Sequence, residues 1–284
     1  MTNRAGGKTV ETVLDDLIFR LEKTSDTPGL DAQVVLARLL GKPRSWVMAH
    51  PEAPLTGNRS VALEGLVVRL EGGEPLPYVL GCWEFFGLEF EITPDVLIPR
   101  PETELLVERA IAWLQVHPDC RRAADIGTGS GCIGIALAAN VPDLRVAASD
   151  ISVQALEIAR HNAAKNGVEE QVEFFCQDLF PAEGEFNLII ANLPYIPTNT
   201  LHGLPIYGRE PTLALDGGAD GLDLIRRLLQ EAPDRLVPGG LLLMEIEASE
   251  GPAILSQVCD IFAEAEIHLH KDLSGHERIL EVQV

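Results

Sequence analysis

The sequence has few cysteines and no closely spaced pair of them. Its five cysteines are scattered over 284 residues, at Cys82, Cys120, Cys132, Cys176 and Cys259. A C-x-x-C pair is the usual signature of a structural zinc site, and a low cysteine content is typical of proteins from a reducing compartment. We therefore expect no metal site and a cytoplasmic location.

Long hydrophobic runs are also lacking. The longest uncharged apolar runs are short, such as residues 241–244. A membrane-spanning helix needs roughly 20 apolar residues. The first eight residues carry charge, but no apolar segment follows them, so they do not resemble a secretory signal. The sequence therefore predicts no association with a membrane.

Basic residues are scarce. Lysine and arginine number 22 against 43 aspartates and glutamates, which gives a net charge of −21. A protein that binds nucleic acid through its phosphates needs a basic face. The charge therefore argues against a nucleic-acid substrate, and an acidic surface suits a basic region of a protein partner.

The first third of the chain has the pattern of a small helical domain. Apolar residues recur at helical spacing over 10–21, and a second helix is expected from Asp31, as its N-cap, to Gly41. A third helix is expected over 61–70. Aromatic and β-branched residues around Gly87 then predict a β-hairpin over 83–93.

From residue 103 the predicted elements alternate between strands and helices. This alternation predicts an α/β fold, with a mostly parallel sheet that has helices on both faces and holds ligands at the carboxyl ends of its strands. We expect three parts: a helical domain at 1–80, a hairpin linker at 81–102 and a catalytic domain at 103–284. The expected strands cover 123–126, 144–149, 171–176, 186–191 and 240–246, and the expected helices cover 104–114, 133–139 and 153–167.

A glycine-rich turn follows the first strand of this sheet. Glycine permits positive φ angles and brings the backbone close to a ligand. Asp150 ends the next strand, 19 residues after the turn, where a carboxylate can accept hydrogen bonds from a ribose diol. Asp178 follows the third strand and is expected at the edge of an adenine. The turn consists of Gly127, Thr128, Gly129, Ser130 and Gly131.

The spacing of these glycines distinguishes between two cofactors. A nicotinamide dinucleotide is usually held by G-x-G-x-x-G, whose helix binds the pyrophosphate. Here the glycines lie two residues apart. S-Adenosylmethionine carries no phosphate and fits this turn better.

The tetrapeptide Asn192-Leu193-Pro194-Tyr195 follows the strand expected at 186–191. The Asn192 amide oxygen and the Leu193 carbonyl, whose direction Pro194 restricts, can together accept both hydrogens of an –NH2 group. Tyr195 offers a flat face for a planar amide or base. An amide nitrogen is a poor nucleophile, and two acceptors would orient it and favour its positively charged transition state. We expect catalysis and substrate binding here, with Asn192 also near the cofactor.

The chain resembles the release-factor glutamine N5-methyltransferases of the class I methyltransferase superfamily. Motifs before and after the tetrapeptide carry the resemblance, from about residue 10 to residue 284. They include Asp31-Ala32, Gly73-Glu74-Pro75-Leu76, Leu97-Ile98-Pro99-Arg100-Pro101-Glu102-Thr103-Glu104, Glu210-Pro211, Ala214-Leu215-Asp216-Gly217-Gly218 and Asp272-Leu273-Ser274-Gly275-His276.

The resemblance implies a seven-stranded Rossmann-like domain and S-adenosylmethionine as the cofactor. It implies methyl transfer to the glutamine of the Gly-Gly-Gln loop in peptide chain release factors, with the helical domain holding the rest of the factor. The chain departs from the family at Leu193, where proline is usual, and at Leu179, near which the family often has tryptophan on the adenine side.

Three alternatives remain open at the level of the sequence. Asn-x-Pro-Tyr would also suit a nucleic-acid adenine N6-methyltransferase, although the charge argues against it. A non-enzymatic adaptor could keep the S-adenosylmethionine pocket without turnover. A dehydrogenase is the most distant alternative.

Overall fold

The computed structural model describes residues 8–284, and the chain divides into two compact units, the first ending at Gly81 and the second running from Cys82 to Val284. Residues 1–7, where the sequence predicts no secretory signal, lie outside the described part. Each unit has its own hydrophobic core.

All regular elements of the first unit, over its described residues 8–81, are helices. The structure places the start of α2 at Pro28 rather than at Asp31, because proline suits the first position of a helix. Asp31 lies in the first turn, where its carboxylate accepts a hydrogen bond of 2.6 Å from the Ser25 hydroxyl. The helices are α1 (Val10–Leu21), α2 (Pro28–Leu40), α3 (Arg44–Ala49), α4 (Gly57–Glu71) and α5 (Leu76–Leu80).

The second unit opens with the predicted hairpin. β1 (Cys82–Phe85) pairs antiparallel with β2 (Leu88–Glu91), and the turn between them has positive φ at Phe86 and Gly87. β2 is held against helix α8 (Val153–Lys165) by Asn162, whose amide bonds both the N–H and the carbonyl of Glu91 at 2.6 and 3.0 Å. The hairpin is therefore part of the second unit.

A seven-stranded sheet forms the centre of this unit, in the order β5-β4-β3-β6-β7-β9-β8. The first five strands are parallel, and β9 runs antiparallel to both of its neighbours. This confirms the predicted fold class. The strands are β3 (Arg122–Ile126), β4 (Arg145–Asp150), β5 (Val172–Cys176), β6 (Phe186–Ala191), β7 (Leu236–Glu245), β8 (Glu266–Lys271) and β9 (Glu277–Gln283).

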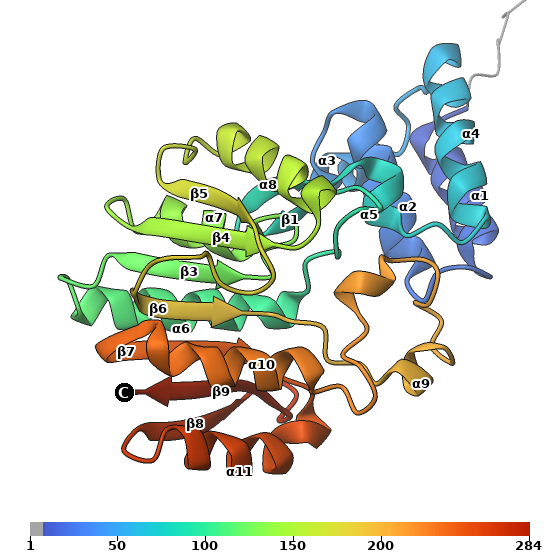
Figure 1. Cartoon of the computed structure of the whole chain (residues 1–284). Helices are drawn as coiled ribbons and strands as arrows, with labels where there is room; N and C mark the ends of the chain where they lie inside the picture. The colour runs from blue at the N-terminus through green and yellow to red at the C-terminus, as the bar shows by residue number, and fades with distance from the viewer. Residues whose placement is uncertain (1–7) are drawn as a thin grey trace, which may run out of the picture. The chain divides into compact units, whose positions relative to one another are not determined.

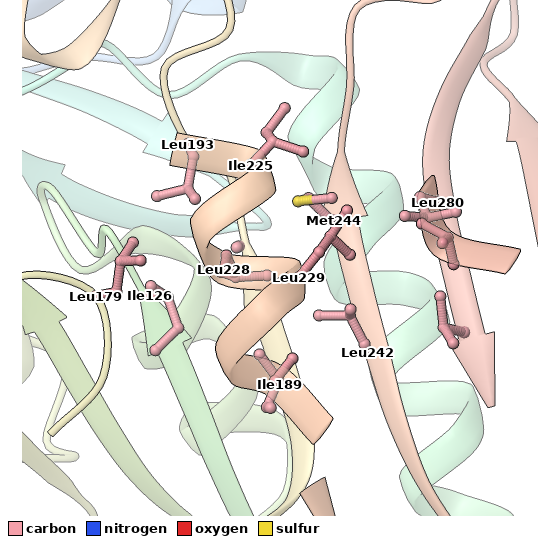
Figure 2. Packing of buried hydrophobic residues seen from close by; sticks show 14 of the residues in the cluster. Ile126, Leu179, Ile189, Leu193, Ile225, Leu228, Leu229, Leu242, Met244 and Leu280 are labelled. Atoms are coloured by element: carbon pink, nitrogen blue, oxygen red, sulfur yellow. The ribbon is translucent and has the colours of Figure 1, made fainter. Parts of the chain in front are cut away.

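Helices cover both faces of the sheet. In Figure 1, α10 and α11 lie on one face, and α6 and α7 lie on the other. Figure 2 shows the core beneath α10, where Ile225, Leu228 and Leu229 pack towards the strands. The bounds are α6 (Glu104–Val116), α7 (Cys132–Asn140), α9 (Thr198–Leu201), α10 (Asp223–Glu231) and α11 (Gly251–Ile261).

The strand order reverses at β3. The chain runs outward through β4 and β5 and then returns to place β6 on the other side of β3. Ligands bind at such a switch point, outside the carboxyl ends of the strands. The glycine turn follows β3 and Asn192 follows β6, so the fold brings both predicted motifs to this point.

Candidate active site

A cavity of about 370 Å³ lies at the switch point. The loops after β3, β4, β5 and β6 form its wall, together with residues 94–97, 99–100, 211 and 213–214. Gly131 and Tyr195 are the two predicted site residues that do not line it. The predicted residues that line the cavity are Gly127, Thr128, Gly129, Ser130, Asp150, Asp178, Leu179, Asn192, Leu193 and Pro194.

The three glycines of the turn all have positive φ, at 72°, 55° and 82°. A Cβ atom at Gly127 would lie 2.8 Å from the Leu193 side chain, and one at Gly131 would lie 2.7 Å from that of Ile135. Space at Gly129 is open. The outer two glycines therefore allow close packing within the protein, whereas the middle one exposes backbone beside the cavity.

Asp150 is held at the cavity by backbone donors. Its Oδ2 accepts from the Gly129 N–H at 2.9 Å, and its Oδ1 accepts from the Ser152 N–H at 2.8 Å. Burial raises the pKa of this carboxyl, and these two backbone bonds oppose the rise. Each oxygen keeps a further lone pair, so the group can still accept hydrogen bonds from a diol.

Asp178 and Leu179 lie where the sequence predicts the adenine. Asp178 Oδ2 forms an ion pair of 2.9 Å with Arg227 of α10, which also lines the cavity. Leu179 has a positive φ of 65°, and its carbonyl accepts from the Ser149 hydroxyl. Their contacts with adenine stay a prediction.

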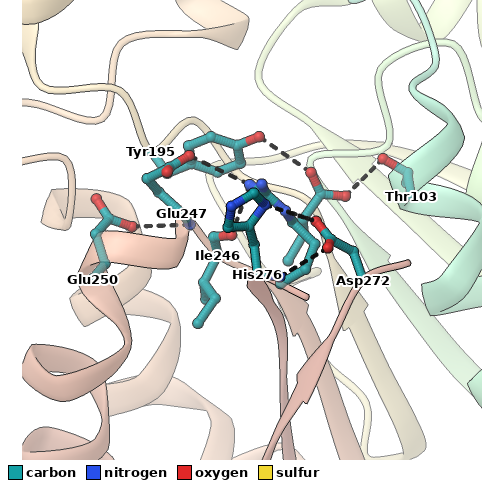
Figure 3. Close-up of polar contacts among 9 residues, drawn as sticks. Thr103, Tyr195, Ile246, Glu247, Glu250, Asp272 and His276 are labelled. Carbon is teal, nitrogen blue, oxygen red and sulfur yellow. Dashed lines mark hydrogen bonds and ion pairs between the residues drawn. The ribbon is translucent and has the colours of Figure 1, made fainter. Parts of the chain in front are cut away.

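Asn192 stands at the end of a chain of buried hydrogen bonds. Its Nδ2 donates to Thr103 Oγ1 at 3.1 Å, and the Thr103 hydroxyl donates to Glu245 Oε2 at 2.6 Å. The Tyr195 hydroxyl donates to the other oxygen of Glu245 at 3.1 Å. Figure 3 shows Thr103 and Tyr195 with the dashed lines that mark these hydrogen bonds. The tyrosine hydroxyl therefore faces into the protein rather than into the cavity.

The positive charge of Arg278 partly balances the negative charge of Glu245. Burial raises the pKa of its carboxyl, while its bonds from Thr103 and Tyr195 and the positive charge of Arg278 lower that pKa. The pKa of the Tyr195 phenol is also raised, through burial and the nearby Glu245 carboxylate. Tyr195 therefore remains a neutral donor at physiological pH.

Leu193 is both a cavity residue and a core residue. Its side chain is 4% exposed and belongs to the cluster that includes Leu179, Ile225 and Leu228 (Figure 2). Leucine at this position therefore packs the tetrapeptide onto the core that carries α10.

An ion pair joins two loops at the cavity wall. Arg100 donates to Glu210 Oε1 at 2.6 Å, and the Ile98 N–H donates to Glu210 Oε2 at 3.1 Å. Glu210 is buried. The sequence motifs around residues 97–104 and 210–211 are therefore held together in space, although the sequence does not show that they meet.

Sequence reasoning also missed two functional candidates. The sequence alone indicates no role for Thr103, which lies in the motif at 97–104, or for Glu245, which lies in the strand expected at 240–246. Their partner Asn192 lies 89 residues from Thr103 along the chain, so no local pattern reveals the contact. Among residues 8–284 no group of histidine, cysteine or acidic side chains could hold a metal ion.

Two family models match the chain. The PrmC N-terminal domain model matches residues 12–81, and the Methyltransferase small domain model matches residues 102–202. The two matches fall in the first and the second unit, respectively.

Proteins from several bacteria are similar to the chain over almost its whole length. The release factor glutamine methyltransferase of Bordetella pertussis is 38% identical over 94% of this chain and 98% of that protein. That of Geobacter sulfurreducens is 37% identical over 99% of this chain and 98% of that protein.

Solved structures share the fold at low sequence identity. The hMettl16 catalytic domain in complex with MAT2A 3'UTR hairpin 6 has a TM-score of 0.55 at 16% identity, over 80% of this chain and 82% of that one. Ribosomal protein L11 methylase from Lactobacillus delbrueckii has a TM-score of 0.51 at 22% identity, over 68% of this chain and 83% of that one.

Proposed function

The chain belongs to the release factor glutamine methyltransferase family, and we propose that it methylates the side-chain amide of the glutamine in the Gly-Gly-Gln loop of peptide chain release factors. It is an S-adenosylmethionine-dependent methyltransferase, as the sequence predicts. The observation that carries the proposal is that the relatedness spans both units, including the helical one.

The residues of the cavity fit the cofactor. Open space at Gly129 leaves the backbone of the turn accessible, and Asp150 presents a carboxylate fixed by two N–H groups. Asp178 and Leu179 form the wall beyond it. Bound here, S-adenosylmethionine supplies an electrophilic methyl group.

The protein's task is then to hold and orient the acceptor nitrogen. The Asn192 amide oxygen and the Leu193 carbonyl are the acceptors for the glutamine –NH2 group. Each hydrogen bond that strengthens as positive charge develops on the nitrogen lowers the barrier. No strong base is needed before attack, because the nitrogen is oriented rather than deprotonated. The methylated nitrogen carries one extra proton, which it releases to solvent after the transfer.

The charge of −21 favours a protein substrate over a polyanion. This supports a Gly-Gly-Gln loop rather than an adenine as the acceptor and disfavours nucleic acid as a partner. No helix within residues 8–284 combines the length and apolarity needed to cross a bilayer. We propose a cytoplasmic location, which the low and scattered cysteine content supports.

Mass spectrometry of a release factor incubated with the enzyme and S-adenosylmethionine tests the proposal. One added methyl group is expected on the Gly-Gly-Gln peptide, and none on a factor whose glutamine is changed to alanine.

The enzyme variant Asn192→Ala should lose methyl transfer about 100-fold, by analogy with the loss of one transition-state hydrogen bond, while calorimetry shows cofactor affinity nearly unchanged. Methylation of adenine in DNA or RNA, with none on the factor, would overturn the proposal.

A further inference from the structure

The orientation of the Asn192 amide decides whether it can bind the substrate. An asparagine side chain presents either its carbonyl oxygen, which accepts hydrogen bonds, or its –NH2, which donates them. Only the oxygen can accept from an acceptor –NH2 group. Something in the protein must therefore select one of two amide orientations of nearly the same shape.

Thr103 faces Asn192 with an acceptor. A threonine hydroxyl has one hydrogen to donate. Here that hydrogen is used on Glu245 Oε2, at 2.6 Å, which leaves only oxygen lone pairs for Asn192 at 3.1 Å. The asparagine must therefore turn its Nδ2 to Thr103, and this directs Oδ1 away from Thr103.

Glu245 fixes the direction of the Thr103 hydroxyl. Glu245 accepts a hydrogen bond at each of its oxygens, from the Thr103 and Tyr195 hydroxyls, and these bonds and the positive charge of Arg278 favour its ionised form against burial, which raises its pKa. Glu245 is 2% exposed, and its second oxygen is occupied by the Tyr195 hydroxyl. Thr103 is also 2% exposed. Thr103 therefore donates to Glu245 and accepts from Asn192, and it has no hydrogen left for the Asn192 oxygen.

The fold brings these three residues together from separate segments. Asn192 follows β6, Glu245 is the last residue of the neighbouring strand β7, and Thr103 ends the short helix η1 (Pro101–Thr103). Thr103 and Asn192 line the cavity, whereas Glu245 lies behind them. Glu245 can therefore affect the reaction only through its neighbours.

We infer that Thr103 and Glu245 are positioning residues, which hold the Asn192 amide with its oxygen available to the acceptor nitrogen. The inference rests on the proposed function, since it concerns how the glutamine nitrogen is bound. It assigns the Pro101-Glu102-Thr103 motif a role in substrate orientation.

Paired substitutions at Thr103 test this role. Thr103→Val keeps the shape but removes the hydroxyl, so kcat towards a Gly-Gly-Gln peptide should fall about tenfold, the size of effect expected when a buried group loses its partner. Thr103→Ser keeps the hydroxyl and should retain at least half of kcat. The Kd for S-adenosylmethionine should change less than twofold in both variants.

Thr198→Val is the matched control. The Thr198 hydroxyl also donates to a carboxylate, that of Asp216, at 2.6 Å, but Thr198 does not line the cavity. This variant should leave kcat near that of the wild type. An unchanged kcat in Thr103→Val, equal losses in Thr103→Val and Thr103→Ser, or an equal loss in Thr198→Val would each overturn the inference.

Nuclear magnetic resonance tests the orientation without any substrate. In protein labelled with [15N]asparagine, the Asn192 –NH2 should show a nuclear Overhauser effect to the Thr103 methyl group, and the Asn192→Ala variant identifies the signal. Absence of that effect would show the opposite orientation and overturn the inference. Should the wild type fail to methylate any release factor, the proposed function fails, while this measurement still decides the orientation.

Discussion

The carboxylate of Asp150 shows how a single residue can be prepared for a ligand by the backbone. Both of its oxygens accept backbone N–H bonds, from Gly129 and Ser152. Side chains are free to rotate, but these N–H groups are fixed by the turn after β3 and the start of α8. The carboxylate therefore needs little reorganisation when a diol binds.

Substituting Asp150 by alanine should weaken cofactor binding. The variant removes two hydrogen bonds to a charged group, each worth about 1.5–3 kcal/mol, so calorimetry should show the affinity for S-adenosylmethionine reduced at least tenfold. Asp143→Ala is the control, because Asp143 pairs with Arg121 away from the cavity and should leave affinity unchanged. Equal affinity in Asp150→Ala and the wild type would exclude Asp150 as the ribose ligand.

At the level of single residues, sequence and structure differ in what they can show. The glycine turn and Asp150 follow consecutive strands, so a local pattern places them at one edge of a parallel sheet. Glu245 and Thr103 are 142 residues apart, and only the packed fold brings them within 2.6 Å. The flat face expected of Tyr195 stays a prediction, and the structure adds that its hydroxyl donates to Glu245.

At the level of elements, the strands and helices between residues 103 and 191 were predicted well, whereas the helices α10 and α11 and several short elements were not predicted. Hydrophobic runs and glycine turns predicted strands β3 to β7 and helices α6 to α8. The short helices α3 and α5 were missed, since fewer than two full turns give no clear periodicity. β9 was also missed. It lies between β7 and β8, and its neighbouring residues Ile279 and Leu280 are both buried, which breaks the alternation typical of a strand.

Two acidic side chains, Glu250 and Asp125, have pKa values that are raised by burial. Glu250 ends the short helix η4 (Ala248–Glu250), and a Cβ atom at Gly221 would lie 2.4 Å from its Oε1. Burial raises the pKa of Glu250 to about 7, and burial raises the pKa of Asp125 to about 6. Both acids therefore bind protons more readily in the folded chain than in the unfolded one.

This difference sets the sign of a pH dependence. A folded state that holds extra protons is stabilised at low pH, and this stabilisation is lost as pH rises through the folded pKa values. We expect the thermal midpoint to fall between pH 5 and pH 8, by a few degrees, as followed by circular dichroism. Glu250→Gln, which does not ionise, should flatten the upper part of this dependence. A midpoint that rises over this range would contradict the assignment.

At the level of the whole molecule, the helical unit presents apolar side chains to its surface. Phe19 of α1 is 73% exposed, and Val61 and Val68 of α4 are 77% and 57% exposed. Exposed apolar side chains are common on protein-binding surfaces. The match of this unit to the PrmC N-terminal domain model agrees with a role specific to the family. We expect these side chains to contact the release factor outside its Gly-Gly-Gln loop.

Comparison of an intact factor with a short Gly-Gly-Gln peptide tests this docking role. The triple variant Phe19→Ser, Val61→Ser, Val68→Ser should raise KM for the intact factor about tenfold, since each lost apolar contact costs of the order of 1 kcal/mol or less when partly buried. KM for the peptide and kcat should not change, because the cavity lies wholly within the second unit. Leu273→Ser, which alters a fully exposed leucine of the second unit, is the control and should leave both KM values unchanged.

If the triple variant raised KM for the peptide as much as for the factor, the effect would lie in the catalytic unit. If neither KM moved, the factor would be recognised elsewhere, and the helical unit would need another explanation.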